Sequence, residues 1–238
     1  MGDNLIGKYS KDVIEYLSSA PLFQDWYGLR QILLERLADD EPWMHALPVL
    51  SCLAVGGDPG RAIPVAAAWT MMYHAANIID EVQDGEIKPD SDIQQPGIAI
   101  PASLSLIFAA FQTLNNSTPE EGVRNPVIEL FTQAGFLSSL GQYRLTIQSH
   151  SHAENQDPLE NQWSNLILKS GSIYRAGVAG GAVVGSGTGA QIEGLGDYGV
   201  AVGVIRQVID DCCDIWVDTL GKTRKTTLPL LLYKLVSD

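Results

Sequence analysis

Two short acidic segments are the most informative features of this chain: Asp80-Glu81-Val82-Gln83-Asp84 and Asp210-Asp211-Cys212-Cys213-Asp214. Each follows a long apolar stretch with helical periodicity, and each places carboxylates at positions i and i+4. On a helix, this spacing puts both side chains on one face, with Cβ atoms about 5–6 Å apart. Because like charges at that distance repel, two such pairs predict a shared partner. Hard divalent cations that bridge to a phosphate fit these oxygen ligands.

Apolar residues recur at three- and four-residue steps along most of the chain. The pattern predicts helices over 11–19, 22–38, 43–55, 61–84, 101–114, 120–149, 158–184, 192–217 and 226–236. Gly56-Gly57-Asp58-Pro59-Gly60 separates two of them, and residues 85–98 are predicted to form a loop. Since no alternating strand pattern or repeat interrupts the series, we expect residues 1–238 to form a single all-α domain.

Composition restricts the kinds of partner. The 238-residue chain has a formal net charge of -13 at pH 7, which argues against nucleic acid and anionic membranes, because both require a basic surface. An anionic substrate can still bind where metal ions supply positive charge. No uninterrupted apolar run reaches the roughly 20 residues that span a bilayer, and the N-terminus lacks a secretory pattern. We expect a cytoplasmic protein without a transmembrane segment.

Two local compositions have competing interpretations. The second acidic segment is flanked by apolar residues such as Val204, Ile205 and Ile209, which favours acids on a buried helix over acids on an exposed outer face. Residues 176–190 are almost entirely small, which indicates close helix packing or room for a ligand. Cys52, Cys212 and Cys213 match neither a zinc spacing nor a disulfide framework, and we expect the adjacent Cys212 and Cys213 to be packing residues.

Basic residues are scarce, so their positions are informative. Lys169 precedes Ser170-Gly171, and Lys222, Arg224 and Lys225 follow the second acidic helix. Cations at these places would hold diphosphate oxygens, and the 222–225 loop would close over the site. The alternative for this loop is a solvated segment favoured by the C-terminal end of the helix dipole.

Together these motifs resemble a family, the trans-prenyltransferases (polyprenyl diphosphate synthases) of the isoprenoid-synthase superfamily. Residues 207–214 match the Gln-x-x-Asp-Asp-x-x-Asp of that family, and Lys169-Ser170-Gly171 is similar to its Lys-Thr/Ser-Gly. Gly141-Gln142 is similar to its mid-chain Gly-Gln, and residues 218–230 look like its closing loop and Thr-Leu-Pro-Leu helix start. The resemblance implies an antiparallel helix bundle around a central cavity.

The resemblance also implies a mechanism and a set of site residues. Mg²⁺ ions would bridge an allylic prenyl diphosphate to carboxylates from both helices, and the C–O bond would break to leave diphosphate and an allylic cation. The implied metal ligands are Asp80, Asp84, Asp210, Asp211 and Asp214, with Gln207 orienting the set. Catalysis would use Asp80, Asp84, Asp210 and Lys169, and the substrate would also contact Gln207, Lys222, Lys225, Ala75 and Ala76.

Departures from the family pattern leave the acceptor of the prenyl group open. Residues 43–48 read Trp-Met-His-Ala-Leu-Pro where the family has Gly-Lys-Arg-x-Arg-Pro, and residues 85–90 lack its Arg-Arg-Gly. The family uses these cations to hold isopentenyl diphosphate. Chain elongation, terpene cyclisation, prenyl transfer to another acceptor and a non-catalytic regulatory subunit therefore remain alternatives. The resemblance is compatible with a homodimer or with a heteromer that includes another synthase subunit.

Overall fold

The computed structural model describes residues 2–85, 95–117, 120–150, 158–217 and 227–237, which are helical almost throughout and contain no strand. The helices are α1 (Gly2–Ser19), α2 (Tyr27–Asp39), α3 (Pro42–Ala54), α4 (Pro59–Asp84), α5 (Pro96–Ser117), α6 (Glu121–His150), α7 (Pro158–Leu166), α8 (Ser172–Val184), α9 (Gly189–Val217) and α10 (Leu228–Ser237). A 3-10 turn, η1 (Pro21–Phe23), precedes α2, and a π-helical turn, η2 (Ile167–Gly171), joins α7 to α8. The all-α prediction is confirmed.

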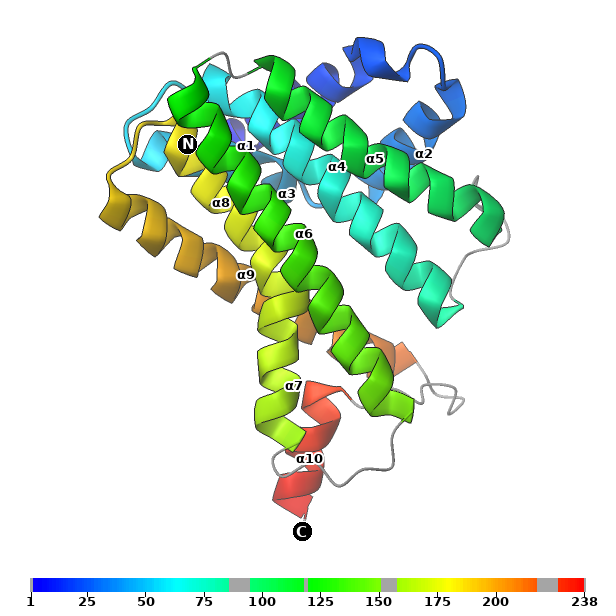
Figure 1. Cartoon of the computed structure of the whole chain (residues 1–238). Coiled ribbons are helices and arrows are strands. Elements are labelled where there is room, and N and C mark those ends of the chain that lie inside the picture. The colour runs from blue at the N-terminus through cyan, green and yellow to red at the C-terminus, as the bar shows by residue number, and fades with distance from the viewer. Residues whose placement is uncertain (1, 86–94, 118–119, 151–157, 218–226, 238) are drawn as a thin grey trace.

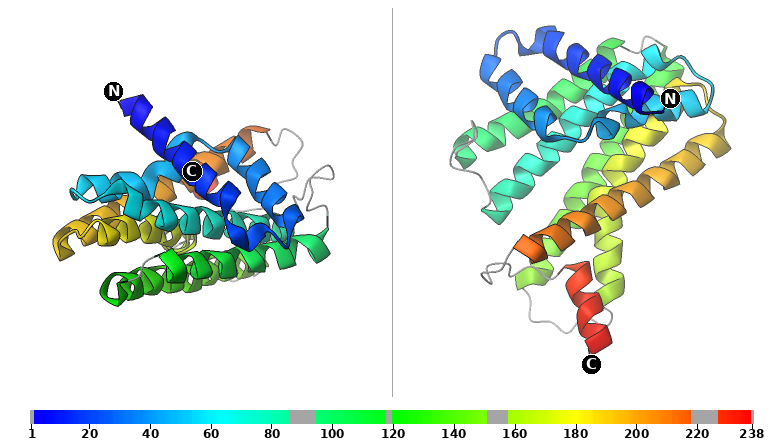
Figure 2. Two further views of the ribbon diagram at one scale, coloured as in Figure 1. Left: turned by 90° about the horizontal axis from the view of Figure 1, so that it is seen from above. Right: turned by 180° about the vertical axis from the view of Figure 1, so that it is seen from behind.

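The long helices form a bundle (Figure 1). α4 packs between α5 and α3, α6 packs along α8, and α8 also contacts α3 and α9. α9 crosses the side of the bundle away from α6 (Figure 2). α10 lies far from the N-terminus, against α7 and α9 (Figure 1). This arrangement brings the C-terminal halves of α4 and α9, which carry the two acidic segments, toward the middle of the molecule.

Small residues set the spacing of α8 in the centre of the bundle. A Cβ on Gly177 would lie 2.5 Å from Trp69, and a Cβ on Gly181 would lie 2.0 Å from the carbonyl oxygen of Pro48. The Trp69 indole also donates to the carbonyl of Ile173 at 2.9 Å. Of the two explanations for the small residues in 176–190, close packing is thus the one observed within α8.

Buried polar groups join the N-terminal helices to α4. Oδ2 of Asp40 lies 3.0 Å from Nε2 of His45 and 2.9 Å from Nε2 of His74, and Nδ1 of His45 lies 3.1 Å from Oγ of Ser10. Burial raises the pKa of Asp40, but the two histidines outweigh it and hold this pKa well below its usual range. Burial lowers the pKa of His74, which keeps this side chain neutral at pH 7.

Several sequence expectations need correction. The predicted helix over 22–38 is interrupted, because η1 ends at Phe23 and α2 begins only at Tyr27. The predicted helix over 158–184 contains the π-helical turn. The apolar residues that flank the second acidic segment on α9 are not all buried, although the sequence predicted burial: Ile205 is 59% exposed and Ile209 is 50% exposed. Cys212 and Cys213 are exposed rather than packed, whereas Cys52 is buried.

Among the helices of the described residues, α5 is long and apolar enough to cross a membrane by length and composition alone. Nearly half of its most apolar window, 44%, is buried inside the structure, largely against α4. The core helix of a globular protein passes the same test, so this helix is weak evidence for a membrane span. The search for uninterrupted apolar runs in the sequence did not identify α5, because Ser, Gly and Pro residues interrupt its apolar residues. These residues still leave the helix with a high mean hydropathy.

Candidate active site

A cavity of about 320 Å³ lies between α4, α6, η2, α8 and α9. This volume is at the lower end of the range for small-molecule sites. Both acidic segments reach it: Asp80 lines the cavity from α4, and Asp210 lines it from α9. The two residues are 130 positions apart in sequence, and the packing of the helix bundle brings both to one cavity. The predicted central cavity is confirmed.

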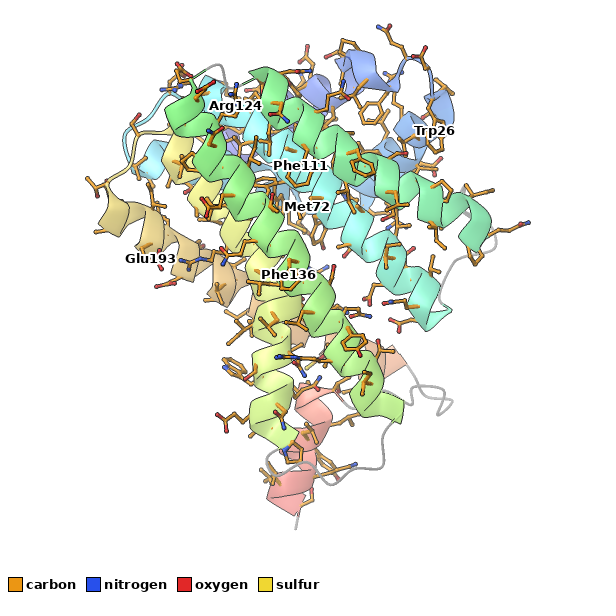
Figure 3. All side chains as sticks on the ribbon, in the orientation of Figure 1. Trp26, Met72, Phe111, Arg124, Phe136 and Glu193 are labelled. Carbon is orange, nitrogen blue, oxygen red and sulfur yellow. The ribbon has the colours of Figure 1, made fainter. Side chains whose placement is uncertain are left out.

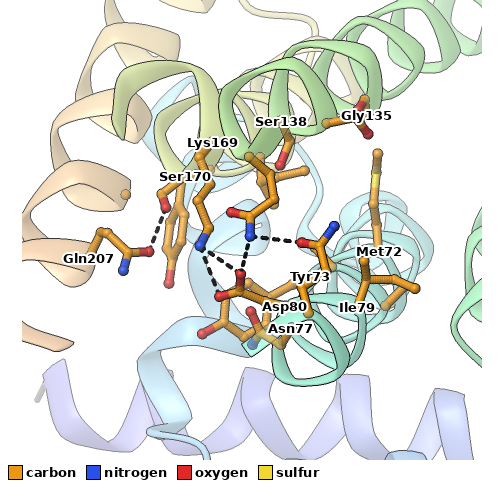
Figure 4. A pocket seen from close by; sticks show the side chains of 18 of the residues that line it. Met72, Tyr73, Asn77, Ile79, Asp80, Gly135, Ser138, Lys169, Ser170 and Gln207 are labelled. Atoms are coloured by element: carbon orange, nitrogen blue, oxygen red, sulfur yellow. Dashed lines mark hydrogen bonds and ion pairs between the residues drawn. The ribbon is translucent and has the colours of Figure 1, made fainter. Parts of the chain in front are cut away.

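Asp80 is held by a cation and an amide. Nζ of Lys169 donates to both carboxylate oxygens of Asp80 at 2.9 Å. Gln142 on α6 donates to Oδ1 of Asp80 at 2.7 Å and to the side-chain oxygen of Gln83 at 2.8 Å. Figure 4 shows Lys169 extending to Asp80 across the cavity. Two other elements, η2 and α6, therefore hold this carboxylate of α4 in one position.

The π-helical turn explains how Lys169 reaches the cavity. A π turn widens the helix locally, and such turns are frequent at functional sites. Gly141 allows α6 to approach this turn, because a Cβ there would lie 2.5 Å from the backbone nitrogen of Lys169. Gly203 does the same on α9, where a Cβ would lie 2.7 Å from the carbonyl oxygen of Ser170. The Gly-Gln pair at 141–142 thus supplies both the close contact and the amide that holds Asp80.

Asp210 is paired with a cation that the sequence analysis missed. Nη1 of Arg206, one helical turn earlier on α9, donates to Oδ1 of Asp210. Next to this pair, Gln207 accepts from the Ser170 hydroxyl at 2.9 Å (Figure 4) and donates to Oδ1 of Asp211 at 3.0 Å. The spacing of four residues between Arg206 and Asp210 could have indicated the pair, because it is the spacing of stabilising ion pairs on a helix.

Aromatic and small side chains form the other walls. Tyr73 on α4 and Tyr174 on α8 line the cavity with ring centroids 5.9 Å apart. Burial raises the pKa of both tyrosines, so both phenols remain neutral near pH 7. The hydroxyl of Tyr174 makes no well-aligned hydrogen bond with any residue that the structure describes. Ala75 and Ala76, predicted as substrate contacts, also line the cavity.

The remaining predicted site residues differ in position. Asp84 is the last residue of α4 and does not line the described cavity. Asp211 is buried and contacts Gln207 rather than the cavity. The side chain of Asp214, and all of Lys222 and Lys225, lie outside the described residues. The structure therefore joins Asp80, Asp210, Lys169, Gln207, Ala75 and Ala76 in one site.

Glu81 of the first segment has a different task. Nη1 and Nη2 of Arg36 on α2 donate to its two carboxylate oxygens at 2.8 Å and 2.6 Å. This two-pronged ion pair ties α2 to the end of α4 beside Asp80. The glutamate thus acts as a tether in this structure, and neighbouring residues of one acidic segment point to different partners.

Residues 43–48 present no cation to the cavity. They lie at the start of α3, where Met44 is 2% exposed, Leu47 is 7% exposed and His45 is 1% exposed. His45 is also engaged by Asp40 and Ser10. These side chains pack in the core, where apolar residues fit. Since His45 is buried with them, it does not replace the basic residues that the family has at these positions.

The family model described as "Polyprenyl synthetase" matches residues 45–231 of this chain. The chain belongs to the polyprenyl synthetase family. Among curated family members, a short chain isoprenyl diphosphate synthase from Methanothermobacter thermautotrophicus is 29% identical over 185 residues, covering 74% of this chain and 55% of the relative. The mitochondrial geranylgeranyl pyrophosphate synthase 10 of Arabidopsis thaliana is 28% identical over 229 residues, covering 90% of this chain and 66% of the relative.

Solved structures of polyprenyl synthetase relatives share the fold. A geranylgeranyl pyrophosphate synthetase from Pyrococcus horikoshii superposes with a TM-score of 0.83 at 23% identity, covering 100% of this chain and 77% of the other. A polyprenyl synthase from Caulobacter crescentus, complexed with calcium and isoprenyl diphosphate, gives a TM-score of 0.81 at 23% identity, covering 100% and 75%. The chain spans between about half and two thirds of the length of its first curated relatives.

Proposed function

We propose that this protein ionises an allylic prenyl diphosphate in a magnesium-dependent prenyl transfer of isoprenoid biosynthesis. One observation carries the proposal: Asp80 and Asp210, from two distant helices, line a single cavity, and each is held by a cationic side chain. Membership of the polyprenyl synthetase family supports it, and curated relatives are named isoprenyl diphosphate synthases.

The residues present fit magnesium. Carboxylate oxygens are the protein ligands that this cation prefers, and the ammonium of Lys169 and the guanidinium of Arg206 already stand where positive charge is favoured. We propose that Asp80 and Asp210 hold the ions directly. Asp84, Asp211 and Asp214 remain proposed members of the set, with Gln207 orienting them. When bound, magnesium would neutralise the charge that accumulates on the departing diphosphate.

The chain's own groups would divide the remaining work. Lys169 would exchange its contact with Asp80 for diphosphate oxygens, and a lysine of the 222–225 loop would also bind those oxygens. Ala75 and Ala76 leave space for the prenyl tail beside the site. Tyr73 and Tyr174 remain neutral and bring aromatic rings to the cavity, where they would exclude water and attract positive charge on the substrate. Together these groups would protect the allylic cation until an alkene attacks it.

A second candidate function is prenyl transfer to an acceptor other than isopentenyl diphosphate. The burial of Met44, His45 and Leu47 favours it, because no residue of 43–48 offers a cation to an acceptor diphosphate. Terpene cyclisation would use the same ionisation without any acceptor. A regulatory subunit would need neither ionisation nor an acceptor, and the intact second acidic motif at residues 210–214 argues against that function.

Assembly and location belong to the same proposal. Leu104 and Phe108 on α5 are 48% and 70% exposed, and Phe136 on the outer side of α6 is 70% exposed (Figure 3). Exposed apolar side chains of this size favour a homodimer, or a heteromer with another synthase subunit. We propose a cytoplasmic location, supported by the acidic composition of the chain.

The test is product analysis with magnesium and geranyl, farnesyl or geranylgeranyl diphosphate, with and without isopentenyl diphosphate. Release of diphosphate is followed continuously. Elongated products that require isopentenyl diphosphate identify a synthase, and hydrocarbons or alcohols formed without it identify a cyclase. Asp80→Asn and Asp210→Asn should each slow diphosphate release by at least about a hundredfold, or ~2.7 kcal/mol in barrier height.

Asp197→Asn is the matched control. Asp197 also lies on α9 and also pairs with an arginine, but its side chain is 70% exposed and does not line the cavity. This variant should keep the wild-type rate. Absence of turnover, together with absence of magnesium-dependent diphosphate binding, would contradict the proposed enzyme.

A further inference from the structure

One positively charged side chain that lines the cavity, Arg206, has no role in substrate binding in the reaction described above. Among the described residues that line the cavity, Lys169 and Arg206 carry positive charge. Lys169 belongs to the motifs that the sequence identifies, whereas Arg206 lies just before Gln207 at a position to which the motif comparison assigned no role. The Arg206 side chain is 35% exposed, so a ligand in the cavity can reach it.

Arg206 and Asp210 form a weak ion pair on the cavity wall. The two residues are one helical turn apart, and the Asp210 side chain is 40% exposed. Exposed pairs of this kind contribute little to stability, so little opposes their exchange for other partners. Partial burial lowers the pKa of Arg206, but the Asp210 carboxylate raises it by more, and the guanidinium stays charged.

Arg175, a second arginine that contacts α9, has the contacts expected of a purely structural residue. Arg175 on α8 is engaged on both sides, since it donates to Glu193 at 2.5 Å and to Asp197 at 2.6 Å. It does not line the cavity. Arg206 instead uses Nη1 for Asp210, and a guanidinium has five N–H donors in all. Arg206 is thus placed in the cavity with donor capacity that a polyanion can use.

We propose that Arg206 binds diphosphate oxygens of the substrate when a divalent cation occupies Asp210. This inference rests on the proposed function. In the ligand-free protein, the guanidinium neutralises Asp210. A metal ion that takes over this carboxylate leaves the guanidinium beside a metal-bound diphosphate, to which it can donate two parallel hydrogen bonds. The ion pair observed here is therefore the resting state of a substrate-binding residue.

The diphosphate could belong to the allylic substrate or to an acceptor that carries one. Both present the same oxygen acceptors to the guanidinium, so the structure assigns the chemistry and the experiment assigns the source. Arg206 would supply a cation that residues 43–48 do not offer. It would do so from α9, on the other side of the cavity from α4.

The experiment measures two affinities in each of four proteins: wild type, Arg206→Gln, Arg206→Lys and the control Arg175→Gln. The first is for Mn²⁺ alone, by water-proton relaxation. The second is for inorganic diphosphate at saturating Mg²⁺, by calorimetry. Arg206→Gln should weaken diphosphate binding by about ten- to a hundredfold, while Mn²⁺ binding is unchanged or tighter because Asp210 has lost its competitor. Arg206→Lys should recover only part of the loss.

A purely structural role would give a different pattern. Misplacement of α9 would weaken Mn²⁺ and diphosphate binding together, and equal diphosphate affinity in wild type and Arg206→Gln would overturn the assignment. Arg175→Gln should match wild type in both measurements. If wild type itself binds no diphosphate with Mg²⁺, the proposed function fails, and this inference fails with it.

Repeating the titration with two substrates assigns the source. One is a sulfur-bridged geranyl diphosphate that cannot ionise, and the other is isopentenyl diphosphate. A loss confined to the geranyl compound places Arg206 on the electrophile, and a loss confined to isopentenyl diphosphate places it on the acceptor. Unchanged affinity for both would overturn the assignment.

Discussion

Replacing Gly141 by alanine tests whether α6 supports the π-helical turn as closely as the structure shows. The added Cβ would lie 2.5 Å from the backbone nitrogen of Lys169, 2.9 Å from the carbonyl oxygen of Asn165 and 2.9 Å from Cβ of Leu168. No rotamer change relieves contacts with backbone atoms, so the helices must separate. Overpacking of this kind costs about 1–3 kcal/mol, against a gain of up to ~1 kcal/mol from higher helix propensity.

The expected net destabilisation is about 1–2 kcal/mol, or roughly 2–8 °C in melting temperature for a chain of this size. Urea unfolding followed by circular dichroism measures it. The same shift moves Lys169 away from Asp80, so diphosphate release should fall by more than the loss of stability alone explains. A displacement near 1 Å at a catalytic group can cost about a hundredfold in rate.

Two other glycines provide graded controls. A Cβ on Gly135, also on α6, would meet only the flexible end of Met72 at 2.9 Å, so Gly135→Ala should be nearly neutral. Gly194 lies exposed inside α9 with nothing within 4 Å of its Cβ position, so Gly194→Ala should stabilise by up to ~1 kcal/mol. If Gly141→Ala is as stable and as active as Gly194→Ala, the close contact between α6 and η2 is wrong.

Three further predictions concern other parts of the molecule. Arg36→Gln and Glu81→Gln should each destabilise the protein, and a double-mutant cycle from urea midpoints should give a coupling of about 0.5–1 kcal/mol; additive losses would show that the pair does not tie α2 to α4. Ala75→Phe should shorten the prenyl products by filling the cavity beside Asp80, and unchanged product lengths by mass spectrometry would contradict this placement of the tail. Because burial lowers the pKa of His74, the unfolded chain binds protons more readily below about pH 6.5, so stability should fall as pH decreases from there. His74→Gln should flatten that fall in urea midpoints measured from pH 7.5 to 5, and an equally steep decline would refute the assignment.

Local patterns predicted much of the fold. Helical periodicity located α3, α4, α6 and α9 to within a few residues, because an apolar stripe at three- and four-residue steps depends only on neighbouring positions. The break before α2 was missed because residues 24–26 interrupt the helix without a proline or glycine among them. The π turn was missed because its pattern is still helical.

The site was predicted in part for the same reason. Asp80, Asp210 and Lys169 were found from motifs, and the structure places all three on the cavity. Arg206 was missed because an arginine on a helix is ordinarily a solvated residue, and only its position on the cavity wall makes it a candidate. His45 can carry a positive charge, but its burial beside Asp40 keeps it away from the cavity, which the sequence alone does not show.

Spacing along a helix and composition are local properties, so they are enough to predict a helical chain with two carboxylate pairs and scarce cations nearby. Which of those carboxylates share the cavity depends on how the helices pack. Successive helical residues point about 100° apart, so Asp210 lines the cavity while Asp211 turns to Gln207, and Asp80 faces Lys169 while Glu81 turns to Arg36. That choice depends on how each helix is rotated against its neighbours, which close contacts such as those at Gly141 and Gly203 set.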